Sequence, residues 1–292
     1  MENMKTWIDY SSLSTFIRCP RAYYLRIVRG IDTADTPSSL LCGKAFHAAK
    51  AAYLISKKSG KPHEESMESA IVAMTEVMSE LKNPDDIRNA SSMVDTLQLY
   101  LEWWQNEDYS IEDVEVQFAV DIGDFIYAGV IDAIKRHPAF GMVVEETKTT
   151  SVPHKWDSRA KPNMQLDGYI AAAYILTGEL AAGSLDIVPL TKKPTKPFRI
   201  LTMRGMDDIA SWLTNVQGWW QSIKSCHERG FFPQNTDNCA PLIGFGCQFH
   251  ILCGMGDINH IKDEDLPSQY IIREWKPFPE LEKEVIKCSY KS

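Results

Sequence analysis

The chain has 292 residues, of which 44% are hydrophobic and 24% are charged. This is the composition of a globular protein with a sizeable core. The start "MENMKTWIDY" has no apolar signal segment, and no stretch is apolar and long enough to span a bilayer, so we expect a cytoplasmic protein without a membrane partner. The net charge of -8 excludes DNA binding by overall attraction, which leaves local basic patches.

The first part of the chain is predicted to be mostly helical. Apolar residues recur at helical spacing through residues 11–28, and Pro20 predicts a break near Cys19. Further helical patterns cover residues 43–58, 64–81 and 84–106. Residues 1–110 therefore form a mainly helical region.

The pattern then changes to the period of strands. Alternating or β-branched segments at 114–122, 125–137 and 141–149 predict an antiparallel meander. A helix at 164–178 follows, then strands at 184–192 and 197–205 and a helix at 207–229. This order predicts an α/β fold with a mixed central sheet flanked by helices, its core lying at 111–230.

The strand segment "MVVEETKTT" carries charges directly after an apolar run. Because strand residues two apart share a face, Glu146 and Lys148 point one way while Glu145 and Thr147 point the other. Asp132 follows apolar residues one hairpin earlier, and two carboxylates brought together repel each other unless a hard divalent cation lies between them. The charged tripeptide taken alone also fits a solvated strand end that frays into a loop.

Four short motifs resemble those of the RecB-type nucleases of the PD-(D/E)XK superfamily. "GKAFH", "GVID", "ETK" and "QLDGY" match the family's G-x-x-x-H, G-x-x-D, E-x-K and Q-x-x-x-Y motifs, in the family's order. Ile131 stands where the superfamily name has a proline. The resemblance implies a restriction-endonuclease-like fold, with a helical N-terminal region and a cysteine-bearing C-terminal tail around the sheet.

The resemblance also implies the roles of the site residues. Mg²⁺ or Mn²⁺ would be bound by His47, Asp132, Glu146 and the backbone carbonyl of Thr147. The catalytic residues would be Asp132, Glu146, Lys148, Gln165 and Tyr169. Gln165 and Tyr169 are four apart, so they share a helix face from which both could approach Lys148 and a phosphate, whereas Lys44 and Lys50 are expected elsewhere on the helix of His47. Taken singly, His47 also fits a core histidine, and Gln165 with Tyr169 a helix surface against its neighbour.

Cysteines mark the irregular tail at 231–292. Cys239, Cys247 and Cys253 are spaced C-x7-C-x5-C, and with Cys19 they make four thiolates that suit a [4Fe-4S] cluster. This resembles the iron-sulfur subgroup of the RecB-type family, which includes CRISPR-associated exonucleases and AddB. Zn²⁺ held by Cys239, Cys247, His250 and Cys253 is an alternative, as are simple buried thiols. Cys42, Cys226 and Cys288 are expected to be structural or exposed thiols.

A cluster shared by Cys19 and the tail would tie the chain ends together, so we expect a single nuclease domain over 1–292. The function predicted is a metal-dependent DNA nuclease, an exonuclease on DNA ends or single strands. It would act in recombination, repair, phage DNA metabolism or CRISPR adaptation, with proteins of recombination, replication or adaptation as partners. The alternatives are a non-catalytic DNA-binding or scaffolding subunit and a zinc-binding interaction protein.

Basic and aromatic residues that could contact DNA gather in three places. They are Arg18, Arg21, Arg26 and Arg29 with Tyr23 and Tyr24; Lys155, Arg159 and Lys161 with Trp156; and Lys192, Lys193, Lys196 and Arg199. Aromatic faces and cations of this kind hold single strands without reading their sequence. Each group also fits solvated charges and core aromatics.

Overall fold

The structure is a computed structural model, which describes residues 6–82, 84–85, 87–239, 246–256, 261–273, 275 and 286–287. Cys288 lies outside these residues. The chain groups into two compact units. Unit 1 comprises Met1–Thr36, Asp121–Ala128 and Leu213–Val285, and unit 2 comprises Pro37–Val120, Gly129–Trp212 and Ile286–Ser292. The single domain with divisions at 110 and 230 stays a prediction.

Unit 2 is built on a mixed sheet with the strand order β7-β6-β5-β4-β3-β9. Strands β4 and β5 pair antiparallel, β6 is parallel to β5, and β7 returns antiparallel to β6. The strands are β3 (Ser110–Asp121), β4 (Phe125–His137), β5 (Gly141–Thr150), β6 (Ala182–Pro189), β7 (Phe198–Thr202) and β9 (Ile286–Lys287).

The parallel pair of β5 and β6 requires a crossover, which helix α6 (Met164–Thr177) supplies. Asn163 caps its start by accepting a hydrogen bond from the Leu166 amide at 3.0 Å, and Gly178, with φ of 74°, ends it. Single 3-10 turns at Pro153–Lys155 and Asp157–Arg159 precede the helix. Leu166 approaches the sheet at Gly183 of β6.

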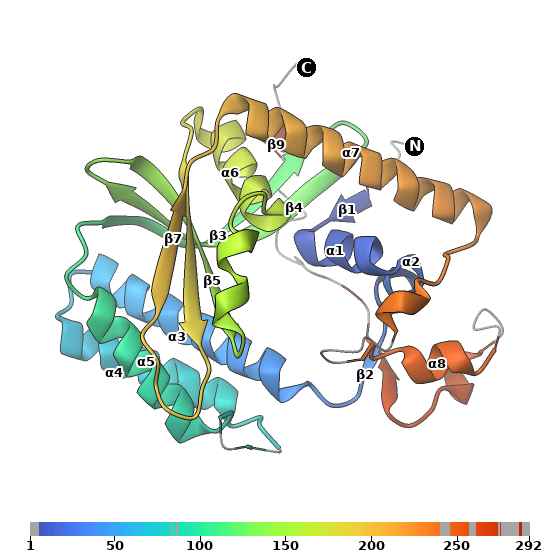
Figure 1. Ribbon diagram of the computed structural model, residues 1–292, viewed down its shortest axis with the longest axis horizontal. Coiled ribbons are helices and arrows are strands. Elements are labelled where there is room, and N and C mark those ends of the chain that lie inside the picture. Colours follow the sequence, from blue (N-terminus) through green and yellow to red (C-terminus); the bar gives the residue numbers. More distant parts are fainter. Residues whose placement is uncertain are drawn as a thin grey trace. The chain divides into compact units, whose positions relative to one another are not determined.

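Helices α3 (Ser38–Lys58), α4 (His63–Met78) and α5 (Ala90–Trp104) cover the other face of this sheet (Figure 1). Tyr100 of α5 donates a hydrogen bond to Asp186, three residues after Gly183, and residues an odd number apart on a strand face opposite ways. The core between these helices and the sheet includes Phe46, Met74, Leu97, Ala133 and Val188, all buried. Both faces of the sheet are therefore covered, as a largely buried central strand requires.

Unit 1 contains short elements and one long helix. Strand β1 (Thr6–Ile8) pairs parallel with residues 125–127 of β4, and β2 (Ile31–Thr33) pairs antiparallel with β8 (Tyr270–Ile272). The helices are α1 (Tyr10–Arg18), α2 (Pro20–Tyr23), a π-helical turn (Tyr24–Val28), α7 (Met206–Arg229), which begins in unit 2, α8 (His250–Gly254), and single turns at Thr236–Asn238 and Asp263–Asp265.

The predicted fold class, a mixed α/β sheet flanked by helices, is confirmed. The break near Cys19 is present because Pro20 begins a new helix. Helix α5 begins at Ala90 and not at residue 84, because the Asn89 side chain accepts a hydrogen bond from the Ser92 amide and caps the helix there. No helix among the described residues is long and apolar enough to cross a membrane.

Gly129, the first residue of "GVID", is predicted to be required for packing. A β-carbon at this position would lie 2.6 Å from the ring of Phe118 and 3.1 Å from that of Tyr169, and both rings are buried. We expect Gly129→Ala to lower the free energy of unfolding by about 1–3 kcal/mol through overpacking. Chemical denaturation measures this.

Gly218→Ala is the matched control, because an added β-carbon there meets no atom within 4 Å and the residue lies inside α7. It should raise stability by at most about 1 kcal/mol through helix propensity. Equal effects of the two substitutions would contradict the packing role of Gly129.

Candidate active site

Strand β5 carries its charged residues in the interior of unit 2. Glu145 and Glu146 are 1% and 2% exposed, so the interpretation as a solvated, fraying strand end is wrong. The Lys148 ammonium lies 2.5 Å from Glu146 Oε1, as expected for residues that share one strand face. A buried carboxylate needs such a partner, since it has lost its hydration.

Asp132 lies beside Glu146 on the neighbouring strand. The register places Ala133 opposite Glu145, so Asp132 and Glu146 are the next pair along. Asp132 Oδ2 accepts a hydrogen bond from the backbone amide of Thr147 at 2.7 Å. The two carboxylates and the E-x-K strand are thus brought together, as predicted from the hairpin.

His47 reaches the same place from α3. Its Nδ1 lies 3.2 Å from Asp132 Oδ1. Burial lowers the pKa of His47, but the charges of Asp132 and Glu146 and the hydrogen bond to Asp132 outweigh burial and raise the pKa above its usual value. The partner of His47 is therefore a carboxylate of the candidate site and not the apolar core.

The pKa values of the two carboxylates, Asp132 and Glu146, are shifted in opposite directions. Burial raises the pKa of Asp132, yet His47, Lys50 and Lys148 outweigh it and lower that pKa below its usual value. The pKa of Glu146 is raised by burial and by repulsion from Asp132, which Lys148 and His47 only partly offset. Asp132 is thus the stabilised anion, and Glu146 bears the repulsion.

Gln165 and Tyr169 face each other on α6. Gln165 Nε2 donates a hydrogen bond to the Tyr169 hydroxyl at 3.1 Å, and both side chains are buried. The Tyr169 ring packs edge-on against Phe118 at a centroid distance of 5.6 Å. The predicted shared helix face is confirmed, while their approach to Lys148 and a phosphate stays a prediction.

Sequence reasoning missed the residues on the other face of β5. Glu145, set aside because it faces away from Glu146, is bound by Lys50 at 2.6 Å, Lys135 at 2.8 Å and Arg199 at 3.3 Å. Lys50, which was expected elsewhere on the helix than His47, contacts Glu145 and Thr147, whereas His47 contacts Asp132. The signal available was the spacing of His47 and Lys50, together with the charge of Glu145.

Glu115 on β3 was also missed. Loss of hydration followed by repulsion from Asp132 raises its pKa to about 7, although its side chain keeps contact with solvent. Its backbone has φ of 51°, which a residue with a β-carbon rarely adopts. Glu115 therefore adds a further acidic group whose charge acts on Asp132 and Glu146.

The donor set suits a hard divalent cation. Carboxylate, imidazole and carbonyl groups ligate such ions, and a cation would relieve the repulsion that raises the pKa of Glu146. In the present arrangement, however, Asp132 is paired with His47 and Glu146 with Lys148. Within the described residues, no group of three or more His, Cys, Asp or Glu side chains is placed so that it could hold a metal ion.

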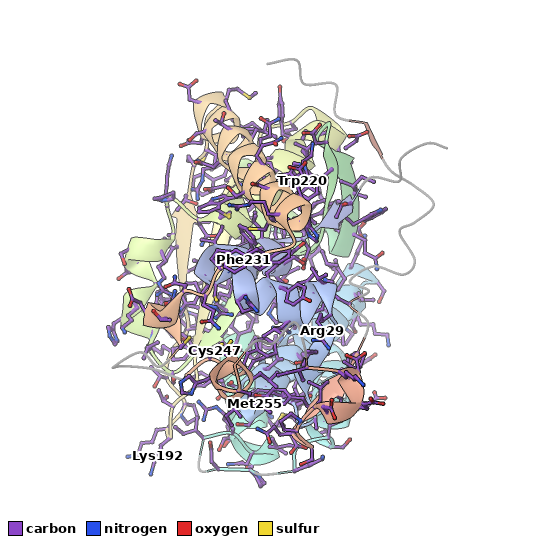
Figure 2. All side chains as sticks on the ribbon, turned by 90° about the vertical axis from the view of Figure 1, so that its right-hand side faces the viewer. Arg29, Lys192, Trp220, Phe231, Cys247 and Met255 are labelled. Carbon is purple, nitrogen blue, oxygen red and sulfur yellow. The ribbon has the colours of Figure 1, made fainter. Side chains whose placement is uncertain are left out.

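The cysteines of the predicted cluster all lie in unit 1. Cys19 occupies the junction of α1 and α2, Cys239 follows a 3-10 turn, Cys247 precedes α8 (labelled in Figure 2) and Cys253 lies within α8. The Cys247 amide donates to the Cys239 carbonyl at 2.8 Å, and the Asn235 amide donates to Cys19 Sγ at 3.4 Å. Residues distant in sequence are thus joined within one unit.

Two of the four thiols, Cys239 and Cys253, have pKa values that the other cysteines influence. Burial, followed by the other three cysteines, raises the pKa of Cys253 to about 11, although Arg21 opposes this. Burial, followed by Cys247 and Cys19, raises the pKa of Cys239. The side chain of His250, the alternative zinc ligand, is exposed to solvent. Cys42 and Cys226 are buried free thiols, as structural cysteines would be.

Two of the basic residues considered for DNA contacts are not on the surface. Arg199 is buried among carboxylates, and Arg21 is buried with its Nε donating to the Phe232 carbonyl at 2.8 Å. Their interpretation as DNA contacts is therefore wrong. Arg159 stacks on Trp156 at 5.7 Å, and the exposed Lys196 lies over the Trp103 ring at 4.4 Å.

The His47–Asp132 pair predicts a pH dependence of stability. The pKa of Asp132 is lowered by folding, so its charge stabilises the fold at pH values above its usual pKa, and this effect is lost as pH falls through the lowered pKa. The pKa of His47 is raised by folding, so its charge stabilises the fold at pH values below its usual pKa, and this effect is lost as pH rises through the raised pKa. Both groups are charged in the unfolded and folded chain between pH about 4 and about 6.5. The loss of stability caused by His47→Gln should therefore be larger at pH about 5.5 than at pH about 9.

Denaturant unfolding of both proteins with EDTA measures this difference. A loss that is equal at the two pH values would show that His47 contributes packing alone and that its charge does not interact with Asp132.

Comparison with known proteins gives the family. The model of the PD-(D/E)XK nuclease superfamily matches residues 9–254. A candidate exonuclease from Eubacterium rectale has a similar structure, with a TM-score of 0.52 and 11% identity over 86% of this chain and 94% of that one, which shows the fold alone. A structure named SSO0001 has 15% identity over 76% of this chain and 78% of its own, with a TM-score of 0.34. No curated protein matches. With more than half of its length matched by the family model, the chain belongs to the PD-(D/E)XK nuclease superfamily.

Proposed function

We propose that the protein is a metal-dependent DNA nuclease that hydrolyses phosphodiester bonds. The observation that carries this is the placement of Asp132 beside Glu146 on adjacent strands, with Lys148 on the Glu146 face and His47 against Asp132. Such groups would be costly to bury together without a use, since the carboxylates repel each other. The exonuclease preference rests on the RecB-type resemblance of the four motifs.

Asp132, Glu146, His47 and the Thr147 carbonyl would hold Mg²⁺ or Mn²⁺. Such an ion would lower the pKa of its bound water below that of bulk water and would polarise the phosphate. Opening of the Lys148–Glu146 pair frees both groups, so that Lys148 can orient the water or stabilise the charge that develops on the phosphate. Gln165 and Tyr169, already joined by a hydrogen bond, would offer an amide and a hydroxyl to the phosphate.

The substrate proposed is DNA at its ends or in single strands, and the setting is recombination, repair, phage DNA metabolism or CRISPR adaptation in the cytoplasm. Proteins of those pathways are the proposed partners. The alternative of a non-catalytic scaffolding subunit is disfavoured, because an inactive protein would have no need to keep Asp132, Glu146 and Lys148 in one buried group.

Within the same proposal, Cys19, Cys239, Cys247 and Cys253 bind a [4Fe-4S] cluster that supports unit 1. The effect of Cys19 on the pKa values of Cys239 and Cys253 supports Cys19 as the fourth ligand. The side chain of His250 is exposed to solvent, so it is a weaker candidate for the fourth ligand than Cys19, and this weighs against the zinc alternative. Iron bound by four thiolates would also offset the burial and the mutual repulsion that raise these pKa values.

Lys148→Ala is predicted to lower the rate of DNA cleavage about 10²–10³-fold, because it removes a group that stabilises the developing charge. The measurement is degradation of labelled linear single- and double-stranded DNA with Mn²⁺ or Mg²⁺. Lys44→Ala is the matched control, since Lys44 is an exposed lysine on the helix of His47, and its rate should equal that of the wild type. Equal rates for Lys148→Ala and the wild type would show that the site is wrong.

The same cleavage assay tests whether the protein requires DNA ends, as an exonuclease does. A closed circular substrate has no ends, so we expect linear DNA to be degraded and the circle to stay intact. Cleavage of both at similar rates would establish an endonuclease and contradict the preference for ends.

The purified protein is predicted to be brown, with broad visible absorption and bound iron, because thiolate-to-iron charge transfer absorbs in this range. Cys19→Ser should lose the colour, while His250→Ala should keep it. A colourless protein with stoichiometric zinc, retained in Cys19→Ser and lost in His250→Ala, would establish the zinc site instead.

A further inference from the structure

A cluster of six charged side chains lies in unit 2 behind the candidate active site. Three cations face three carboxylates, so the cluster is formally neutral: Lys50, Lys135 and Arg199 against Glu107, Glu145 and Asp186. Asp186 is fully buried and also accepts a hydrogen bond from the Tyr100 hydroxyl at 2.6 Å. Glu145 lies at the centre, because it contacts all three cations.

Neutrality alone does not explain such a cluster. Removing six charges from water costs free energy that their mutual attraction repays only in part, and apolar side chains of similar volume often serve a core as well. A buried charge cluster is therefore expected where it also holds a neighbouring strand or helix in a defined position. The candidate is the strand that carries Glu145.

Lys50 connects this cluster to the active site. Its ammonium contacts Glu145 Oε1 at 2.6 Å and also donates a hydrogen bond to Thr147 Oγ1. Glu145 and Thr147 are the two neighbours of Glu146 and lie on the strand face opposite to it. One buried ammonium thus ties together both residues that flank Glu146.

We propose that Lys50 is a positioning residue, which acts through Glu145 and Thr147 to hold β5 so that Glu146 and the Thr147 carbonyl stay beside Asp132, where a divalent cation would bind. The inference rests on the proposed nuclease function. It also explains how Asp132 is oriented, since Thr147, bound by Lys50 through its hydroxyl, donates its backbone amide to Asp132. Partners behind metal ligands are typically worth about 10–100-fold in metal affinity.

Lys135 provides a matched control. It is as deeply buried as Lys50, at 5% against 2% exposed, and it contacts the other oxygen of Glu145 at 2.8 Å. Both lysines line the same small pocket beside Tyr100 and Trp104. The two lysines differ in their second partner, which is Glu107 at 3.8 Å for Lys135 and Thr147 for Lys50.

The experiment compares Lys50→Met with Lys135→Met in the full-length protein, by Mn²⁺ titration calorimetry, thermal unfolding without metal, and cleavage kinetics. Both variants should unfold at lower temperature, because each leaves Glu145 with one cation fewer. Lys50→Met should in addition raise the Kd for Mn²⁺ about 10-fold or more, while Lys135→Met leaves it unchanged. The double variant Lys50→Met with Glu145→Gln should recover thermal stability but not Mn²⁺ affinity.

Thr147→Val tests the same positioning role if Lys50→Met does not fold. It removes only the hydroxyl that Lys50 binds, keeps the branched shape and leaves the Lys50–Glu145 pair in place, so Mn²⁺ affinity should fall with little change in unfolding temperature. Equal Mn²⁺ affinity in wild type, Lys50→Met and Thr147→Val overturns the positioning role, as does an equal loss in Lys50→Met and Lys135→Met. A wild type that neither binds Mn²⁺ nor cleaves DNA overturns the proposed function itself, and this inference with it.

Discussion

Strand β5 carries charged side chains on both of its faces within a buried sheet, and much of unit 2 is arranged to accommodate them. On one face, Glu146 has Lys148, Asp132 and His47 as neighbours, and on the other, Glu145 is surrounded by three cations. A carboxylate out of water must find a cation or donors, so each face imposes its own set of partners. The partners come from α3, from β4 and from β7, which therefore have to pack at defined positions against β5.

The two faces differ in what their charges achieve. Glu145 has several cations, which hold its pKa well below the usual range despite burial. Glu146 has one cation and a second carboxylate nearby, so its pKa is raised. On the first face the cations outweigh the burial of the carboxylate, while the second face retains repulsion that a divalent cation would relieve. One strand thus carries a carboxylate surrounded by cations on one face and a repelled carboxylate on the other, and this difference is the physical basis for proposing a cation site at Glu146.

One part of unit 1 is built from short elements around a small apolar cluster. The helices α2 and α8 and the strands β2 and β8 are short, and their apolar cluster is small. Cys19, Cys247 and Cys253 belong to that cluster or pack against it. Small cores of this kind are commonly reinforced by metal or disulfide bonds, which is the physical basis for proposing a cluster there.

Much of the secondary structure could be predicted from the sequence, because the periods of apolar residues differ between helices and strands and because Pro20 and Gly178 mark helix ends. It also singled out Asp132, Glu146 and Lys148, since a strand's two-residue period assigns their faces. The contacts of Glu145, Lys50, Arg199 and Glu115 could not be predicted from the sequence and follow from the tertiary structure. Lys50 and Arg199 both contact Glu145 although they are distant from it along the chain. No local period of the sequence specifies which helix or strand a buried charge will contact.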